Sequence, residues 1–247
     1  MFRIRMTLPK GKSVAYRHTD ILHDAIVSAW ISAGADAEKI TGFHASPWNF
    51  AALGWRRGQE NRTHTLIIST SEPELSEYLT LLTPPDVAYA RAATAEAVDF
   101  SGAEIIPDPA PVAPGQNAVG VLMLSPLAIS RKGRGKNGHR WHSNLNEADL
   151  SLAINHRLSR MAGRKVCLGV HADKLYLRAN PRHDVLIPVK ELPNGKRAFV
   201  IGMKAPLVLQ GNEDDLRLAW YAGIGEKTRN GFGCVGLVEK GVGRWKI

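Results

Sequence analysis

The sequence predicts an α+β protein made of two βαββαβ units in tandem, with a basic helical insertion in the second unit. Strand-like and helix-like segments follow each other in this order in both halves, which is the split βαβ arrangement of ferredoxin-like folds. Four prolines between residues 107 and 114 cannot continue a helix or a strand ladder, so residues 107–117 are predicted to be a linker. The 247 residues are 44% hydrophobic and can bury a substantial core. The predicted units therefore span residues 1–106 and 118–247.

The first unit opens with Phe2–Leu8, where apolar residues alternate with cations as in a half-buried strand. A helix is expected from Thr19, a good N-cap residue, to Ala33, because Gly34 is a typical helix stop. The further elements expected in this unit are strands at residues 40–48 and 65–70, a helix from Ser71 to Leu82, and a last strand within residues 87–100.

The second unit is expected to begin with a strand at residues 118–124. A helix should run from Asn146, a possible N-cap, to Met161, with Gly163 as its end. The later elements are strands at residues 166–170, 175–178 and 198–209, a turn at 193–195, a helix at 216–222 capped by Asn212, and a final strand at 234–238.

A glycine-rich loop, residues 223–233, connects the last helix to the last strand and holds four glycines and two cations, Lys227 and Arg229. Glycine at this density allows positive φ and close approach of another chain, so consecutive N–H groups can turn outward. The pattern is typical of an anion site, with a tight structural connection as the alternative. Nucleotide-binding loops are not favoured, because the glycine spacing and the helix–loop–strand order both differ from theirs.

The charge of the chain indicates an acidic partner. The formal net charge is +9 and the pI is near 9.7. Residues 131–165 hold nine Lys or Arg and two acids, so they carry most of the excess. Residues 131–138 have few apolar side chains and are expected to order only on a partner. We predict that this basic segment binds nucleic acid.

The sequence has no run of 18 apolar residues, and its first six residues do not read as a signal peptide. Its two cysteines, Cys167 and Cys234, have no second Cys or His at metal-ligand spacing. We therefore expect a cytoplasmic protein without a membrane partner, and predict neither a metal nor a cofactor.

Two stretches carry a family resemblance: residues 200–211 (VIGMKAPLVLQG) and 222–235 (AGIGEKTRNGFGCV). The Gly-x-Gly-Glu-Lys and Gly-Phe-Gly-Cys parts are similar to the signature of the CRISPR repeat-processing endoribonucleases of the RAMP superfamily. The compact size and the arginine-rich helix favour the type IV variant of that family.

The resemblance implies metal-independent cleavage of CRISPR repeat hairpins in precursor transcripts, which yields mature crRNA. The ribose 2′-hydroxyl attacks the phosphorus in line, and the products carry a 2′,3′-cyclic phosphate and a 5′-hydroxyl. The family also implies that the enzyme keeps the crRNA bound and joins other subunits of a CRISPR effector complex. Such cleavage needs a base, an acid and cations for the developing charge.

The resemblance places a histidine base on or just beyond the first helix, where His23 follows Leu22. His23 lies beside the apolar stripe of that helix, so we expect it to be half accessible. His18 and His44 are alternatives, and Tyr16 is a candidate assistant. An arginine-based site without a histidine base also stays open.

The predicted RNA contacts come from three segments. They are Gly223, Gly225, Lys227, Arg229, Gly231 and Gly233 of the glycine-rich loop; Arg131, Lys132, Arg134, Lys136 and Arg140 of the basic loop; and Arg157, Arg160 and Arg164 on the following helix. Trp141 and His142 could stack on an unpaired base. A non-catalytic crRNA-binding subunit and a basic RNA chaperone are the alternative functions.

Overall fold

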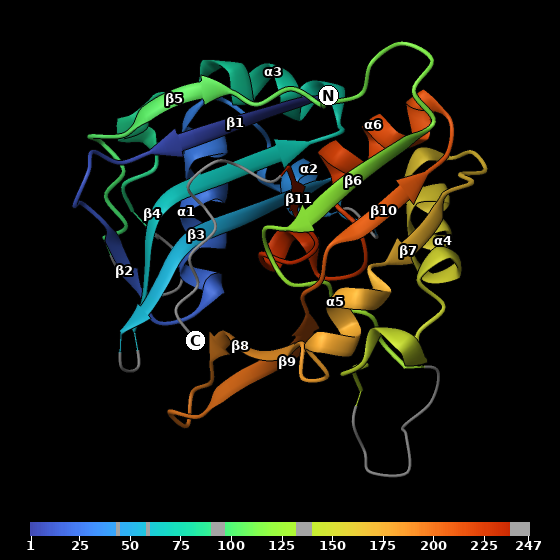
Figure 1. The fold of residues 1–247 in the computed structure, drawn as a ribbon. Helices are drawn as coiled ribbons and strands as arrows, with labels where there is room; N and C mark the ends of the chain where they lie inside the picture. Colours follow the sequence, from blue (N-terminus) through green and yellow to red (C-terminus); the bar gives the residue numbers. More distant parts are fainter. Residues whose placement is uncertain (43–44, 58–59, 90–96, 132–139, 238–247) are drawn as a thin grey trace.

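The computed structural model describes residues 1–42, 45–57, 60–89, 97–131 and 140–237. It confirms an α+β architecture of two ferredoxin-like units in tandem (Figure 1). Each unit has a four-stranded antiparallel ferredoxin-like sheet. If the four strands of a unit are numbered along the chain, their order across the sheet is fourth, first, third, second in both units.

The first unit contains the βαββαβ order with two additions. Its strands β1 (Phe2–Thr7), β3 (Trp48–Arg57), β4 (Glu60–Thr70) and β5 (Glu104–Pro107) pair in the order β5-β1-β4-β3. Its two main helices are α1 (Thr19–Ser32) and α3 (Pro73–Leu81). The additions are β2 (Val14–Tyr16), which continues the β1 edge along β4, and the short helix α2 (Ala37–Thr41).

The second unit repeats this topology. Its strands β6 (Ala118–Met123), β7 (Gly169–Ala172), β10 (Leu207–Gln210) and β11 (Val235–Gly236) pair in the order β11-β6-β10-β7, and its helices are α4 (Leu150–Ala162) and α6 (Glu213–Ala222). Between β7 and β10 lie the helix α5 (Lys174–Ala179) and a hairpin of β8 (Asp184–Glu191) and β9 (Arg197–Met203). The 3-10 helices η1 (Pro84–Asp86), η2 (Leu145–Glu147) and η3 (Thr228–Asn230) complete the described elements.

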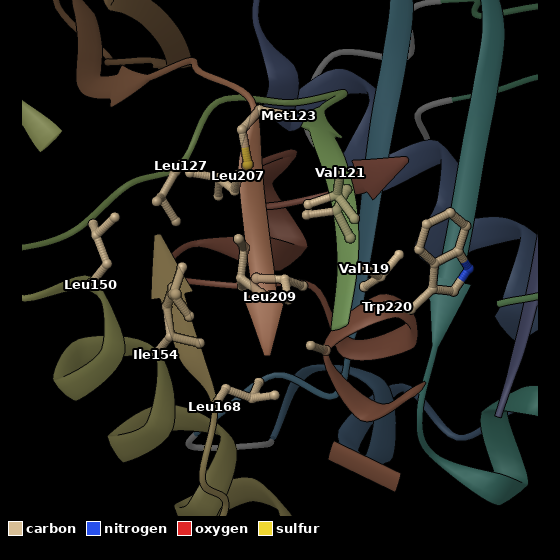
Figure 2. Packing of buried hydrophobic residues seen from close by; sticks show 14 of the residues in the cluster. Val119, Val121, Met123, Leu127, Leu150, Ile154, Leu168, Leu207, Leu209 and Trp220 are labelled. Atoms are coloured by element: carbon tan, nitrogen blue, oxygen red, sulfur yellow. The ribbon is translucent and has the colours of Figure 1, made fainter. Parts of the chain in front are cut away.

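Each unit has its own apolar core. In the first unit the indole rings of Trp30 on α1 and Trp48 on β3 meet edge to face, with 4.9 Å between centroids. In the second unit, Val121 and Leu209 on neighbouring strands share one apolar cluster with Ile154 of α4 (Figure 2). Burial of such side chains stabilises the fold by roughly 1.5–3 kcal/mol each. Both cores follow the apolar periodicity of the sequence.

The two units are joined by polar and apolar contacts that run between the first sheet and the second unit. Asn49 Nδ2 and Ser69 Oγ both donate to the carbonyl oxygen of Tyr221 on α6, each at 2.8 Å. Arg3 is buried and donates from Nη1 to the carbonyl oxygen of Val235 (2.7 Å). One face of the first sheet is therefore covered by α1 and α3, and part of the other by the second unit.

The proline-rich segment is packed against both units. Asp108 forms ion pairs with Arg3 and Arg5 on β1. Val112 is buried in the core of the second unit. These contacts fix the path of the chain where it passes from the first unit to the second.

Several predicted element positions are wrong. The strand predicted at residues 40–48 is wrong where the structure describes it: residues 40–41 belong to α2, because the Asp36 side chain caps a helix by accepting from the amide of Glu38. Residues 43–44 lie outside the described residues, and Trp48 is the first residue of β3. The strand predicted at 175–178 is the helix α5, for the same reason: Asp173 caps it. Asx caps therefore outweighed the local strand pattern at both places.

Further corrections concern the last strand of the first unit and the elements inserted in the second. The last strand of the first unit, β5, begins at Glu104, beyond the expected range of 87–100, and β8 was not predicted. The basic helical insertion is not confirmed, because the helix in that segment, α4, is the first helix of the second βαββαβ unit. The elements inserted in this unit are α5 and the β8–β9 hairpin.

Candidate functional site

The glycine-rich loop, residues 223–233, is built by close packing. A Cβ on Gly225 would lie 2.3 Å from Leu127 Cδ1, and one on Gly233 would lie 1.8 Å from the carbonyl oxygen of Ile224. Both glycines have positive φ, +75° and +70° respectively, where a side chain would also be strained. The glycines are therefore required for the loop to pass between its neighbours.

The amides of this loop do not all turn outward as predicted. Ile224 N donates to Gly233 O, Glu226 N to Ala128 O, and Gly233 N to Pro126 O, at 2.8–2.9 Å. All four glycines of the loop are buried. Among the glycines, Gly231 and Gly233 have amides that are bonded within the protein, so these two amides are not free to bind phosphate. The side chains of Lys227 and Arg229 are therefore the better candidates for phosphate contacts.

Lys227 and Arg229 lie at the surface end of the loop. Lys227 is exposed and has a φ of +59°, which is a left-handed conformation. Arg229 is on η3 and donates from Nη1 to the carbonyl oxygen of Thr41 in the first unit (2.6 Å). Glu226 accepts from both the amide and the hydroxyl of Ser130. These contacts hold the two cations at the junction of the units.

Arg157 on α4 connects both units and the glycine-rich loop. Its guanidinium donates to the carbonyl oxygens of Ser46, Ala222 and Gly223 and to Thr228 Oγ1. Burial lowers its pKa to about 10, and Glu226 opposes this shift. The structure thus gives Arg157 a structural role, although the sequence predicted an RNA contact.

The three arginines predicted as RNA contacts on and after α4 therefore differ in their surroundings. Arg160 is exposed. Arg164, which follows the helix, forms an ion pair with the buried carboxylate of Asp215. Arg164 is exposed too but is already paired, so Arg160 is the better candidate for a ligand contact.

His23 on α1 lies against Trp48, with 5.4 Å between the ring centroids and an interplanar angle of 21°. Its Nε2 atom is buried and has no hydrogen-bond partner among the residues that the structure describes. Burial lowers the pKa of His23, Arg229 lowers it further, and Asp20 and Asp24 oppose the shift. A neutral imidazole therefore lies within electrostatic range of the glycine-rich loop.

The other predicted catalytic residues lie in different environments. His18 is 1% exposed at the N-cap of α1. Tyr16 packs against the core of the first unit, and burial raises the pKa of its hydroxyl. His44 lies outside the described residues, as do the predicted RNA contacts Lys132, Arg134 and Lys136. Of the candidates that are described, His23 is the one that the structure brings toward the glycine-rich loop.

A cleft of about 1070 Å³ opens between the two units. Its walls come from the loop before β3, from α4, from the segments around Ser130 and His142, and from the glycine-rich loop. The cations that line it are Arg131, Arg140, Arg157, Arg160, Lys227 and Arg229, and the acids are Glu147, Asp149 and Glu226. The excess of cations makes the cleft suitable for an anionic ligand.

Two histidines, His156 and His142, line the cleft and become candidates for ligand contacts. His156 was not predicted, because a histidine on the exposed side of α4 shows no motif in the sequence. His142, predicted only as a stacking partner, lines the cleft; burial and Arg131 lower its pKa, and Glu147 opposes them. Both imidazoles could contact a ligand through hydrogen bonds or stacking.

The described part of the chain was also searched for other kinds of site. It contains no group of three or more His, Cys, Asp or Glu side chains placed to hold a metal ion. None of its helices is long and apolar enough to span a membrane.

The fold and the cleft define the class of the protein as a tandem ferredoxin-like protein with a cationic cleft between its units. The sequence matches the family described as "CRISPR associated protein Cas6, C-terminal" over residues 108–237, which is more than half of the chain. The chain belongs to this family of CRISPR-associated RAMP proteins. A comparison with proteins of curated function gives no match.

Solved structures share the whole fold. A Cas6-related protein of Pyrococcus furiosus is 18% identical, with a TM-score of 0.66 over 97% of this chain and 99% of that one. A RAMP protein described as binding different RNA substrates is 17% identical, with a TM-score of 0.66 over 97% and 100%. A further CRISPR associated protein Cas6 is 17% identical, with a TM-score of 0.62 over 96% and 99%. At this identity the likeness supports the fold of both units.

Proposed function

We propose that this protein is a metal-independent endoribonuclease that cleaves CRISPR repeat hairpins in precursor transcripts and keeps the crRNA bound. Membership of the Cas6 family and the cationic cleft support a role in CRISPR RNA binding and processing. The cleft contains guanidinium groups that can pair with phosphates, and it lies at the junction of the units. The RNA backbone would follow this cleft.

The observation that supports the catalytic part is that the charge of Arg229 in the glycine-rich loop acts on His23. η3 packs on α1 and β3. A base from the first unit and a cation from the second are thus brought to one place. Acid–base cleavage of a phosphodiester needs both kinds of group.

In the proposed step, His23 Nε2 takes the proton of the 2′-hydroxyl while O2′ forms a bond to phosphorus. The P–O5′ bond breaks in line, and the departing oxygen takes a proton from the solvent. Arg229 and Lys227 would stabilise the charge that develops on the phosphoryl oxygens. His23 must be neutral for this role, as its lowered pKa favours.

The buried position of His23 Nε2 requires a local movement when substrate binds. Arg229 is the side chain that we expect to move, because it is held to Thr41 by a bond at the surface. A phosphate could replace the Thr41 carbonyl as its partner with a charge-assisted bond. Binding and exposure of the base would then be coupled.

The same buried atom favours a second candidate, a crRNA-binding subunit of a CRISPR effector complex without catalytic activity. In that case the cleft would hold the RNA and His23 would serve only in packing on Trp48. Contacts with other effector subunits are proposed for both candidates.

One experiment separates the two. The protein is incubated with the repeat RNA of the CRISPR array adjacent to its gene, in EDTA, and both RNA ends are mapped. A single cut with a 2′,3′-cyclic phosphate and a 5′-hydroxyl would support the endoribonuclease. A gel shift without any cut product would support the binding subunit, and a strict need for Mg²⁺ would contradict the proposed mechanism.

A further inference from the structure

The β3–β4 hairpin carries an exposed aromatic pair outside the cleft. Trp55 on β3 is 48% exposed, and His64 on β4 is also exposed. Their rings stack with 6.1 Å between centroids and an interplanar angle of 29°. An indole held open to solvent beside an imidazole offers a surface on which another flat ring can stack.

A β-bulge fixes this pair in place. The register of β3 and β4 shifts after the Leu53–Thr65 pair, because His64 is an extra residue on β4. A Cβ on Gly54 would lie 1.8 Å from the carbonyl oxygen of Arg62, so the bulge requires glycine there. His64 Nδ1 also shares a hydrogen bond with Thr65 Oγ1 (2.9 Å). Bulges of this kind redirect side chains next to functional sites.

The charge around the pair suits an anionic ligand. Arg56, Arg57 and Arg62 belong to the same hairpin, and Glu60 is its one acid. Arg56 and Arg57 are exposed, and Arg62 contacts Ser13 and Glu60. Partial burial lowers the pKa of His64, so its ring is neutral at neutral pH and can stack. Aromatic rings flanked by cations are the usual elements of single-strand RNA binding.

The pair lies on the face of the first sheet that the second unit covers in part. Ala51 and Leu53 on β3 pack in the apolar cluster that contains Cys234, and Trp55 is on the same face by strand alternation. Ser46, just before β3, lines the cleft. Trp55 is seven residues from Trp48, or roughly 23 Å along the strand. In Figure 1 the end of β3 and the start of β4 lie at the lower left, far from α4.

We propose that Trp55 and His64 form a second RNA site that stacks an unpaired nucleotide from the segment flanking the hairpin held in the cleft. The inference depends on the proposed function only in taking RNA as the ligand, and it applies equally to a catalytic and to a non-catalytic protein. The distance from the cleft suits a short single-stranded extension. Sheets of this fold that bear aromatic side chains bind unpaired bases in the same way.

The test measures the dissociation constants of the full chain for four RNAs: the repeat hairpin alone, the hairpin with eight uridines added at its 5′ end, the same with eight uridines at its 3′ end, and a single-stranded 12-mer of uridine. We expect one of the two extensions to lower the dissociation constant of the hairpin. Trp55→Ala should raise the dissociation constant of that extended hairpin by about 5- to 150-fold and so remove the gain. Trp55→Phe should keep most of the gain, and His64→Ala should lose part of it. Phe199→Ala, at another exposed aromatic residue, is the matched control.

The outcomes distinguish this inference from the proposed function. If Trp55→Ala leaves the affinity for both extended hairpins and for the 12-mer unchanged, the second site is wrong. An equal loss for the hairpin alone would also overturn it, because the effect would then not concern an unpaired segment. If the hairpin does not bind but the 12-mer binds through Trp55, the proposed function fails while the second site stands.

Discussion

Two arginines predicted as RNA contacts, Arg157 and Arg229, have different roles in the structure. Arg157 is surrounded by four acceptors from both units, whereas Arg229 is held by a surface bond to the Thr41 carbonyl. The first stabilises the junction at which the glycine-rich loop meets the first unit. The second lies at that junction with its charge near His23. The difference teaches that cations predicted alike from the sequence can have different partners, buried acceptors for Arg157 and a surface carbonyl for Arg229.

The largest effect should come from His23, the proposed base. We expect His23→Ala to lower the cleavage rate by about 10²- to 10⁴-fold, since it removes a general base. Repeat RNA affinity should stay within about twofold, because the imidazole contributes no charge. Single-turnover cleavage and gel shift measure the two quantities. Full cleavage by this variant would exclude His23 as the base.

Arg157→Ala should mainly reduce stability. It leaves three carbonyl oxygens and a hydroxyl without their donor, and we expect a loss of about 2–4 kcal/mol. For a chain of this size the melting temperature would fall by roughly 5–15 °C. Arg160→Ala, one turn further along α4, is the matched control and should melt within about 2 °C of the wild type. Equal melting temperatures for both variants would refute the structural role of Arg157.

Arg229→Ala should mainly reduce RNA binding. We expect about fivefold weaker affinity, and the slope of log affinity against log salt should fall by about 0.7. Because Arg229 lowers the pKa of His23, the variant should also shift the pH profile of cleavage upward. Arg182→Ala, at an exposed cation outside the cleft lining, is the control. An unchanged salt slope would show that Arg229 does not contact a phosphate.

The order of elements could be predicted because it depends on local signals. Apolar periodicity, the Gly163 end of α4 and the Asn212 cap of α6 are properties of short segments, and the structure has all three. The errors at α2 and α5 also arose locally, where Asp36 and Asp173 favour a helix over a weak strand pattern. Closer attention to aspartate caps would have corrected both.

The site was less predictable because it depends on contacts between distant segments. The helical spacing of Arg157 resembles that of Arg160, and nothing in the sequence tells which of them meets the carbonyls of a loop 66 residues later. The stacking of His23 on Trp48 likewise requires β3 to pair as it does. The glycine-rich loop was found by its composition, yet the amides of Glu226 and Gly233 turn inward because the carbonyl oxygens of Ala128 and Pro126 accept from them.

The central claim is that a neutral His23 from the first unit acts as the base beside Arg229 of the second. The most direct test is the pH profile of single-turnover cleavage in EDTA. His23 has a pKa below its usual 6.5, so the rate should be constant above that pH and fall tenfold per pH unit below the lowered pKa, where the imidazole binds a proton. His23→Ala should lose this dependence along with most of its activity. A rate that does not fall at low pH, or a fall that persists in His23→Ala, would contradict the account.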